Sequence, residues 1–87
     1  MRLVWDENAW QDYLHWQKTD TRVLKRINLL LTDITRTGNV GIGKPEALKH
    51  GGFQGFWSRR ITEEHRLVYR VDDDAVLIAQ CRYHYGV

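Results

Sequence analysis

The chain has 87 residues, a formal net charge of +2 and 43% hydrophobic residues. This length suits one domain with a single modest core. One cysteine, Cys81, excludes an intramolecular disulfide and favours a reducing compartment. Acidic residues follow the first five positions, so we expect neither a signal peptide nor a membrane span there. The composition predicts a soluble cytoplasmic protein.

Charge is distributed unevenly along the chain. Residues 22–60 hold eight basic and two acidic side chains, whereas residues 1–21 hold two and four, and residues 61–87 hold three and five. A concentrated basic surface attracts phosphate backbones. A solvated helix face with ordinary surface lysines has the same composition, so charge alone does not decide between the two.

The first 37 residues predict a short strand followed by two helices. Residues 1–5 read as the strand, and Asp6 is a suitable cap for a helix over residues 6–17. A second helix over residues 20–37 carries one apolar stripe and ends at Gly38. The stripe consists of Val23, Leu24, Ile27, Leu30, Leu31 and Ile34. We expect the two helices to pack as a hairpin against an apolar surface.

Residues 38–55 contain six of the seven glycines and the only proline. Irregular connections of this length are usually functional or disordered, so we predict a functional loop with one helical turn beginning at Pro45. The run from Gly38 to Lys44 is close to a Walker phosphate-binding loop. That reading fails because Pro45 replaces the required Ser or Thr and a helix, not a strand, precedes the loop.

Residues 56–85 predict a three-stranded antiparallel sheet with two short links. If each turn holds three residues, Ile61 faces His65 and Val71 faces Ala75. Even-numbered residues then share one face and odd-numbered residues the other. The odd face would be the apolar one: Trp57, Ile61, Leu67, Tyr69, Val71, Leu77, Ala79 and Cys81. The even face would be polar: Ser58, Arg60, Arg66, Arg70, Gln80, Arg82 and His84.

Clustered arginines and a histidine, beside a loop that carries Glu46, have the parts for RNA phosphodiester cleavage. That reaction needs a base for the 2′-OH proton, cations around the phosphorus and an acid for the leaving 5′ oxygen. It requires no cofactor and no metal. The four candidate ligands have spacings that fit no zinc pattern; they are His50, His65, Cys81 and His84.

Four segments carry a family resemblance: RLVWDENAW, GKPEALKH, GFWSRRITEEHRLVYRV and the closing CRYHY. From about residue 1 to residue 85 the chain resembles the YoeB branch of the RelE-type toxins, mRNA interferases of bacterial toxin-antitoxin pairs. The resemblance implies an α+β fold of the RelE-like type, with one toxin domain over residues 1–87. In this fold the three C-terminal strands and a short N-terminal strand form a small antiparallel sheet, and the two-helix hairpin covers one face.

The resemblance also implies an activity and partners. The activity is ribosome-dependent endonucleolytic cleavage of translated mRNA in the A site, and the partners are a YefM-like antitoxin and a second copy of the chain. By motif position, Glu46 is the general base, Arg66 stabilises the phosphate and His84 is the general acid. Lys49, Arg60 and Tyr85 match positions that hold RNA. The chain departs from the family in continuing through residues 86–87 and in having Ala47 where proline is common.

The residues themselves leave other readings open. An unperturbed Glu46, with a pKa of about 4.3, is a feeble base at neutral pH, whereas His84, near about 6.5, is poised as an acid. Without the family, His84 could be a packed strand end, Arg60 and Arg66 solvated positions, and Glu46 a partner for a helix cap. The fold also suits a non-catalytic module that acts on DNA gyrase, or a face that receives a peptide.

In the closing segment, strand parity predicts that Cys81 and Tyr83 lie on the core side and that Arg82 and His84 face the RNA. We expect order through Tyr85, because a general acid on a fraying end would not be held in place.

Overall fold

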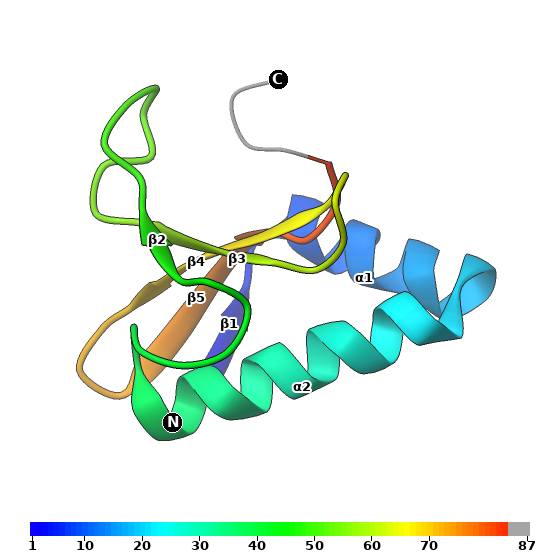
Figure 1. Cartoon of the computed structure of the whole chain (residues 1–87), viewed down its shortest axis with the longest axis horizontal. Helices are drawn as coiled ribbons and strands as arrows, with labels where there is room; N and C mark the ends of the chain where they lie inside the picture. Colours follow the sequence, from blue (N-terminus) through cyan, green and yellow to red (C-terminus); the bar gives the residue numbers. More distant parts are fainter. Residues whose placement is uncertain (84–87) are drawn as a thin grey trace.

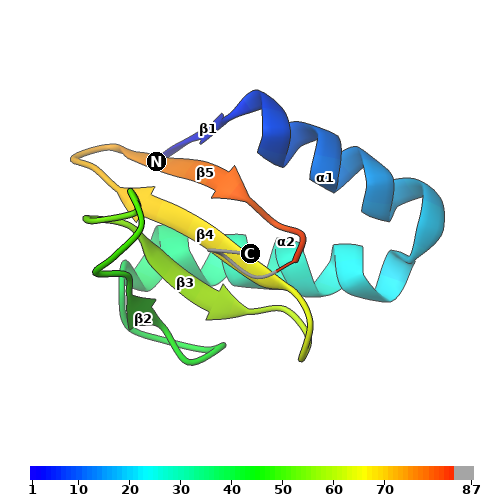
Figure 2. The same ribbon diagram turned by 90° about the horizontal axis from the view of Figure 1, so that it is seen from above.

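The computed structural model describes residues 1–83, in which two helices cover one face of a five-stranded sheet. Figures 1 and 2 show this two-layer arrangement. The strand order is β1-β5-β4-β3-β2, with β1 parallel to β5 and the other pairs antiparallel. The elements are β1 (Arg2–Trp5), α1 (Glu7–Thr19), α2 (Thr21–Thr37), β2 (Glu46–Ala47), β3 (Trp57–Arg60), β4 (Arg66–Val71) and β5 (Ala75–Gln80). The predicted α+β class is confirmed, but the sheet is mixed and has five strands, whereas an antiparallel sheet of four strands was predicted.

Two aspartates define the helix boundaries. The Asp6 carboxylate accepts a hydrogen bond from the Asn8 backbone N–H and so caps α1, as predicted. The Asp20 backbone N–H closes α1, and its carboxylate accepts from the N–H groups of Arg22 and Val23 in α2. Because one residue ends the first helix and begins the second, the two helices turn sharply into a hairpin.

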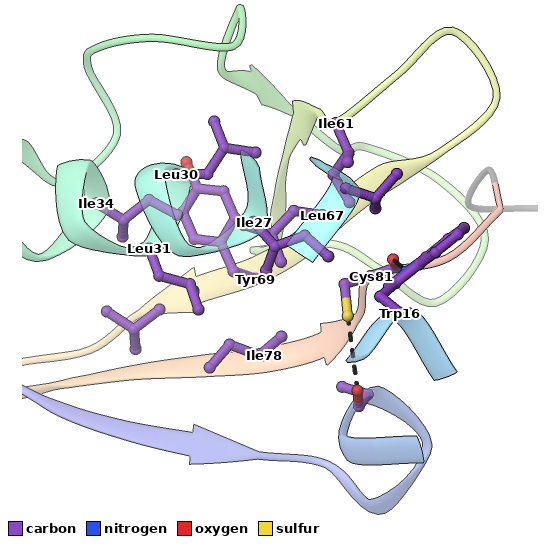
Figure 3. Packing of buried hydrophobic residues seen from close by; sticks show 13 residues of the cluster. Trp16, Ile27, Leu30, Leu31, Ile34, Ile61, Leu67, Tyr69, Ile78 and Cys81 are labelled. Atoms are coloured by element: carbon purple, nitrogen blue, oxygen red, sulfur yellow. Dashed lines mark hydrogen bonds between the residues drawn. The ribbon is translucent and has the colours of Figure 1, made fainter. Parts of the chain in front are cut away.

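The core lies between this helix hairpin and the sheet (Figure 3). The apolar stripe of α2 is buried there as predicted, with Ile27, Leu30 and Ile34 fully enclosed. Burying a side chain of this size stabilises the fold by about 1.5–3 kcal/mol. From α1, Trp16 reaches across the core, and its indole N–H donates to the backbone oxygen of Cys81 at 2.8 Å.

The first hairpin has the predicted register. Trp57 pairs with Tyr69 and Arg60 pairs with Arg66, and the Ile61 N–H donates to the His65 oxygen at 3.0 Å. On β3 and β4, odd-numbered residues therefore face the helices and even-numbered residues face away.

The predicted register of the second hairpin is wrong by one residue. The Asp72 N–H donates to the Ala75 oxygen at 2.9 Å, so Asp72 faces Ala75, the first residue of β5, and Val71 faces Val76. The slip places Val76 and Ile78 in the core. Leu77 and Ala79, which we had predicted there, are half-buried and lie outside the core cluster.

A β-bulge between Val68 and Tyr69 limits the effect of this slip. Beyond the bulge Gln80 pairs with Val68, so the two strands are back in the predicted parity at the end of β5. Cys81 consequently lies in the core, fully buried, as predicted.

The helical turn predicted to begin at Pro45 is absent. Glu46 and Ala47 instead form β2, which pairs with Ser58 and Trp57 of β3 at the edge of the sheet. The segment between β2 and β3 rises on the side of the sheet away from the helices (Figure 1). Strand pairing thus brings the loop glutamate to the even-numbered face of β3.

Within residues 1–83, no helix is long and apolar enough to cross a membrane.

Candidate functional site

Two predicted site residues, Glu46 and Arg66, share the open face of the sheet with Ser58. Glu46 pairs directly with Ser58, and side chains of directly paired residues point to the same face. Arg66, an even-numbered residue of β4, shares that face. It pairs with Arg60 of β3, and its side chain extends diagonally to Ser58. The register of β2, β3 and β4 therefore gathers a carboxylate, a hydroxyl and a guanidinium.

Arg66 is a buried cation with few partners. The residue is 9% exposed, and its Nη2 donates to the Ser58 Oγ at 2.8 Å. Within residues 1–83 the buried Nε has no hydrogen-bond partner, and no carboxylate forms an ion pair with the guanidinium. A buried charge left in this state is costly, and a bound anion would remove most of that cost.

A pocket of about 480 Å³ opens beside Glu46. The glutamate is exposed at its rim, on the two-residue strand that begins the wall. The wall combines this carboxylate, a lysine, a histidine and apolar groups; it is lined by Glu46, Ala47, Leu48, Lys49, His50, Gly51 and Phe53. The lining thus combines charged and apolar groups, which suits a nucleotide with its charged backbone and its aromatic base.

The two predicted flanking cations are exposed. Lys49 lines the pocket, two residues beyond β2, and Arg60 ends β3 opposite Arg66. The Arg60 backbone N–H donates to the Gly43 oxygen at 2.7 Å, which fixes the approach of the loop to β2.

Arg59 is a further arginine whose role the sequence analysis missed. It is fully buried, and its guanidinium makes five hydrogen bonds: to the Tyr69 hydroxyl, the Asp33 carboxylate and the backbone oxygens of Gly38, Val40 and Ile42. The hydrogen bond from Arg59 is the main reason that the pKa of Asp33 is lowered. Arg59 has an odd number, so its parity already placed it on the core face, where an arginine needs an acidic partner.

This arginine divides the long glycine-rich segment into two parts. Residues 38–43 are attached to α2 and β3 through Arg59 and Asp33, and the Ile42 N–H also donates to the Asp33 carboxylate at 3.1 Å. Residues 48–56 form the separate, outward-rising part beside the pocket.

The C-terminal segment is attached next to Arg66. The Arg66 N–H donates to the Tyr83 oxygen at 3.0 Å, and the Tyr83 N–H donates to the His65 Nδ1 at 2.8 Å. The predicted general acid His84 and the predicted RNA-binding Tyr85 lie outside the described residues. Tyr83, the residue before His84, is nevertheless hydrogen-bonded to Arg66, the first residue of β4.

Parity fails for the two residues before His84. Tyr83, predicted on the core side, is 56% exposed and has a positive φ of 63°. Arg82, predicted on the open face, lies with its guanidinium carbon 6.0 Å from the Trp16 ring centroid, on the side of α1. Strand alternation ends with β5 at Gln80, so it does not apply to these positions.

Within residues 1–83 there is no group of three or more metal-ligating side chains.

Comparison with known proteins gives one consistent result. Residues 5–85 match the model of the YoeB-like toxin of bacterial type II toxin-antitoxin system. The chain is 64% identical to Toxin YoeB of Escherichia coli K12 over 85 residues, which cover 98% of this chain and 100% of that protein.

Solved structures agree with this match. The YoeB/ParE toxin from Agrobacterium tumefaciens superimposes with a TM-score of 0.93 at 50% identity, covering 98% of this chain and 100% of that one. YoeB of Staphylococcus aureus, solved as a dimer and in a YoeB-YefM complex, gives TM-scores of 0.91 and 0.89 at 48% and 46% identity, with 98% of both chains covered. The chain therefore belongs to the YoeB-like toxins of bacterial type II toxin-antitoxin systems.

Proposed function

We propose that this toxin is an endoribonuclease that cleaves mRNA during translation, without a metal ion. The observation that carries the proposal is Arg66, a buried cation on the face that also presents Glu46, with an Nε that has no partner among the described residues. A phosphodiester in this position would supply the missing anion. Stabilising charge as it builds on a phosphate is the largest single contribution that such a site makes.

Each proposed catalytic residue has one task. Glu46 takes the proton of the ribose 2′-OH, and the 2′ oxygen attacks the adjacent phosphorus. Arg66 donates hydrogen bonds to the phosphate oxygens as negative charge accumulates. His84 gives a proton to the leaving 5′ oxygen. The products are a 2′,3′-cyclic phosphate and a 5′-hydroxyl, and proton exchange with water restores Glu46 and His84.

The remaining predicted residues bind RNA. Lys49, at the pocket, and Arg60, beside Arg66, are exposed cations within reach of the neighbouring phosphates. Tyr85 would stack on a base, as aromatic side chains do on single-stranded RNA.

The partners in this proposal are the ribosome with its mRNA, a YefM-like antitoxin and a second copy of the toxin, in the cytoplasm. The Staphylococcus aureus relative, solved as a dimer and in complex with YefM, supports the last two partners. Glu46 is exposed at the rim of its pocket, so the substrate itself has to be positioned precisely. A ribosome that holds mRNA in the in-line geometry would provide that positioning, which can lower a barrier by several kcal/mol.

The proposal is tested by adding purified toxin to a translating extract and mapping new mRNA ends. We expect 5′-hydroxyl ends within translated codons, and a loss of roughly 10²–10³-fold in cleavage rate for Arg66→Ala. Glu46→Gln and His84→Gln should lose activity as well. Naked RNA should be cleaved far more slowly than the same RNA on ribosomes.

Arg70→Ala is a matched control, because Arg70 is on the same strand and is paired with Asp72. It should cleave as the unaltered toxin does. If the unaltered toxin creates no new ends, or His84→Gln cleaves at full rate, the proposed reaction is wrong and a non-catalytic, gyrase-directed role gains support.

A further inference from the structure

Ser58 is at the centre of the site but belongs to none of the predicted roles. It is fully buried on β3, with Glu46 of β2 as one backbone partner and Val68 of β4 as the other. Its hydroxyl accepts the hydrogen bond from the Arg66 Nη2. A buried hydroxyl that accepts a hydrogen bond from a catalytic arginine restricts the direction in which the guanidinium points.

The neighbouring Arg59 shows what a purely structural arginine looks like in this sheet. All five of its N–H groups have acceptors, and Asp33 balances its charge. Arg66 is nearly as buried, yet its one side-chain partner within residues 1–83 is an uncharged hydroxyl. Ser58 therefore fixes the guanidinium without neutralising it.

We propose that Ser58 is a positioning residue that holds the Nη2 edge of Arg66, so that the Nε–H remains directed at a phosphate oxygen of the RNA. The inference rests on the proposed function in one respect, that Arg66 binds the reacting phosphate. A carboxylate at position 58 would hold the same edge but would also cancel the charge of the guanidinium. The hydroxyl holds the edge and leaves the charge intact.

Cleavage on mRNA-programmed ribosomes tests the role by single-turnover kinetics. We expect Ser58→Ala to lower the maximal rate by roughly tenfold to a hundredfold, the worth of one hydrogen bond to a charged group, with little change in the toxin concentration that gives half the maximal rate. Ser58→Thr, which keeps the hydroxyl, should recover most of the rate. Ser58→Asp should be less active than Ser58→Ala.

A double-mutant cycle separates positioning from mere structure. In an Arg66→Ala background, Ser58→Ala should cause no further loss, because the residue acts only through Arg66. If the two losses multiply, or if Ser58→Thr is as impaired as Ser58→Ala, Ser58 is not a positioning residue.

Phosphate binding gives a second test that does not need catalysis. The ¹⁵N–¹H signal of the Arg66 Nε, identified by its absence in Arg66→Lys, should shift on titration with inorganic phosphate. Ser58→Ala should weaken the apparent affinity by roughly tenfold or more. No shift in the unaltered toxin, or equal affinity in Ser58→Ala, overturns the inference.

The two tests fail separately. If the unaltered toxin cleaves no mRNA but its Arg66 binds phosphate in a Ser58-dependent way, the proposed function is wrong and the positioning role stands. If the toxin cleaves mRNA and Ser58→Ala matches it in rate and in phosphate affinity, the proposed function stands and the positioning role is wrong.

Discussion

Cys81 ties the end of the sheet to the first helix through three different atoms. Its backbone N–H donates to the Asp12 carboxylate at 3.1 Å, its oxygen accepts from Trp16, and its sulfur lies 3.6 Å from the Ala9 oxygen (Figure 3). Burial, reinforced by the charge of Asp12, raises the pKa of the thiol to about 12. A buried thiol of this kind is chemically inert.

The raised thiol pKa predicts alkaline instability. The unfolded thiol ionises near the ordinary value of 9.0 and the folded thiol near about 12, so its stabilising contribution is complete below pH 9 and is lost as the pH rises from 9 to 12. Over this range the unfolding free energy should fall by up to about 1.4 kcal/mol per pH unit more steeply than in Cys81→Ala. Urea unfolding at several pH values measures both slopes, and parallel slopes would disprove the assignment.

The adjacent arginines Arg59 and Arg60 show how far single-residue prediction reaches. Strand alternation sends them to opposite faces, and the first-hairpin register makes this exact. The sequence does not identify the acceptors of Arg59, because three of them are backbone oxygens of a loop without periodicity. The sequence therefore predicts on which face each arginine lies, but not which atoms of the irregular loop backbone Arg59 contacts.

At the scale of elements, the anchored part of the loop depends on a glycine. Gly41 has a φ of 144°, and a Cβ built there would overlap the Asp33 Oδ2. A methyl group at this position must displace the carboxylate that pairs with Arg59. The loop conformation that leads to β2 and Glu46 thus requires the absence of a side chain at residue 41.

Gly41→Ala and Gly51→Ala form a matched pair. Gly51 also has a positive φ, but a Cβ there meets nothing within 4 Å. We expect Gly51→Ala to lower Tm by roughly 4–8 °C, the cost of backbone strain alone, and Gly41→Ala by at least roughly twice as much. Calorimetry of both variants gives the comparison. Equal losses would mean that the Asp33–Arg59 pair adapts to the methyl group.

The two hairpins differ in how strongly the sequence specifies their register. In the first hairpin the polar residues Ser58, Arg60 and Arg66 are even-numbered, and the odd-numbered residues of β3 and β4 are apolar apart from Arg59, so one register separates the two kinds best, and its prediction was correct. The run from Ala75 to Ala79 is apolar throughout, so a slip of one residue exchanges apolar side chains for other apolar side chains. The turn hydrogen bond from Asp72 to Ala75 and the bulge decide it instead, and neither has a signal in the sequence.

On the scale of the whole molecule, the site draws cations from separate segments to one side of the sheet. Lys49 comes from the outward part of the loop, Arg60 from β3 and Arg66 from β4, while Lys25 is on the outer surface of α2. Binding of single-stranded RNA should therefore weaken with salt, in proportion to the number of phosphates that the site contacts.

Removing one of these contacts should change the salt dependence by a defined amount. In a Glu46→Gln background, which on the proposed function does not cleave, Lys49→Gln should lower the slope of log affinity against log salt by about 0.7, and Lys25→Gln should leave it unchanged. Fluorescence anisotropy of a labelled single-stranded RNA measures each slope. An unchanged slope for Lys49→Gln would remove this lysine from the RNA-binding surface.

The topology contains one feature that local sequence patterns do not reveal. The two helices, the three C-terminal strands and the short N-terminal strand were all predicted, but a strand of four residues has many possible partners. Its parallel pairing with β5 depends on the packing of the intervening helix hairpin against the sheet. The edge strand β2 was missed for the related reason that two residues carry no periodicity.

The parallel pairing of β1 with β5 also determines when the molecule becomes complete during its own synthesis. The two helices can form on a nascent chain, whereas β1 waits for Ala75 to Ile78, which are made nearly a whole chain later. The contact of Trp16 with Cys81 waits as long. A ribosome that has not reached these codons carries a chain whose sheet is still open at one edge. On the proposed function, the toxin is harmless to its own ribosome until β5 has been translated.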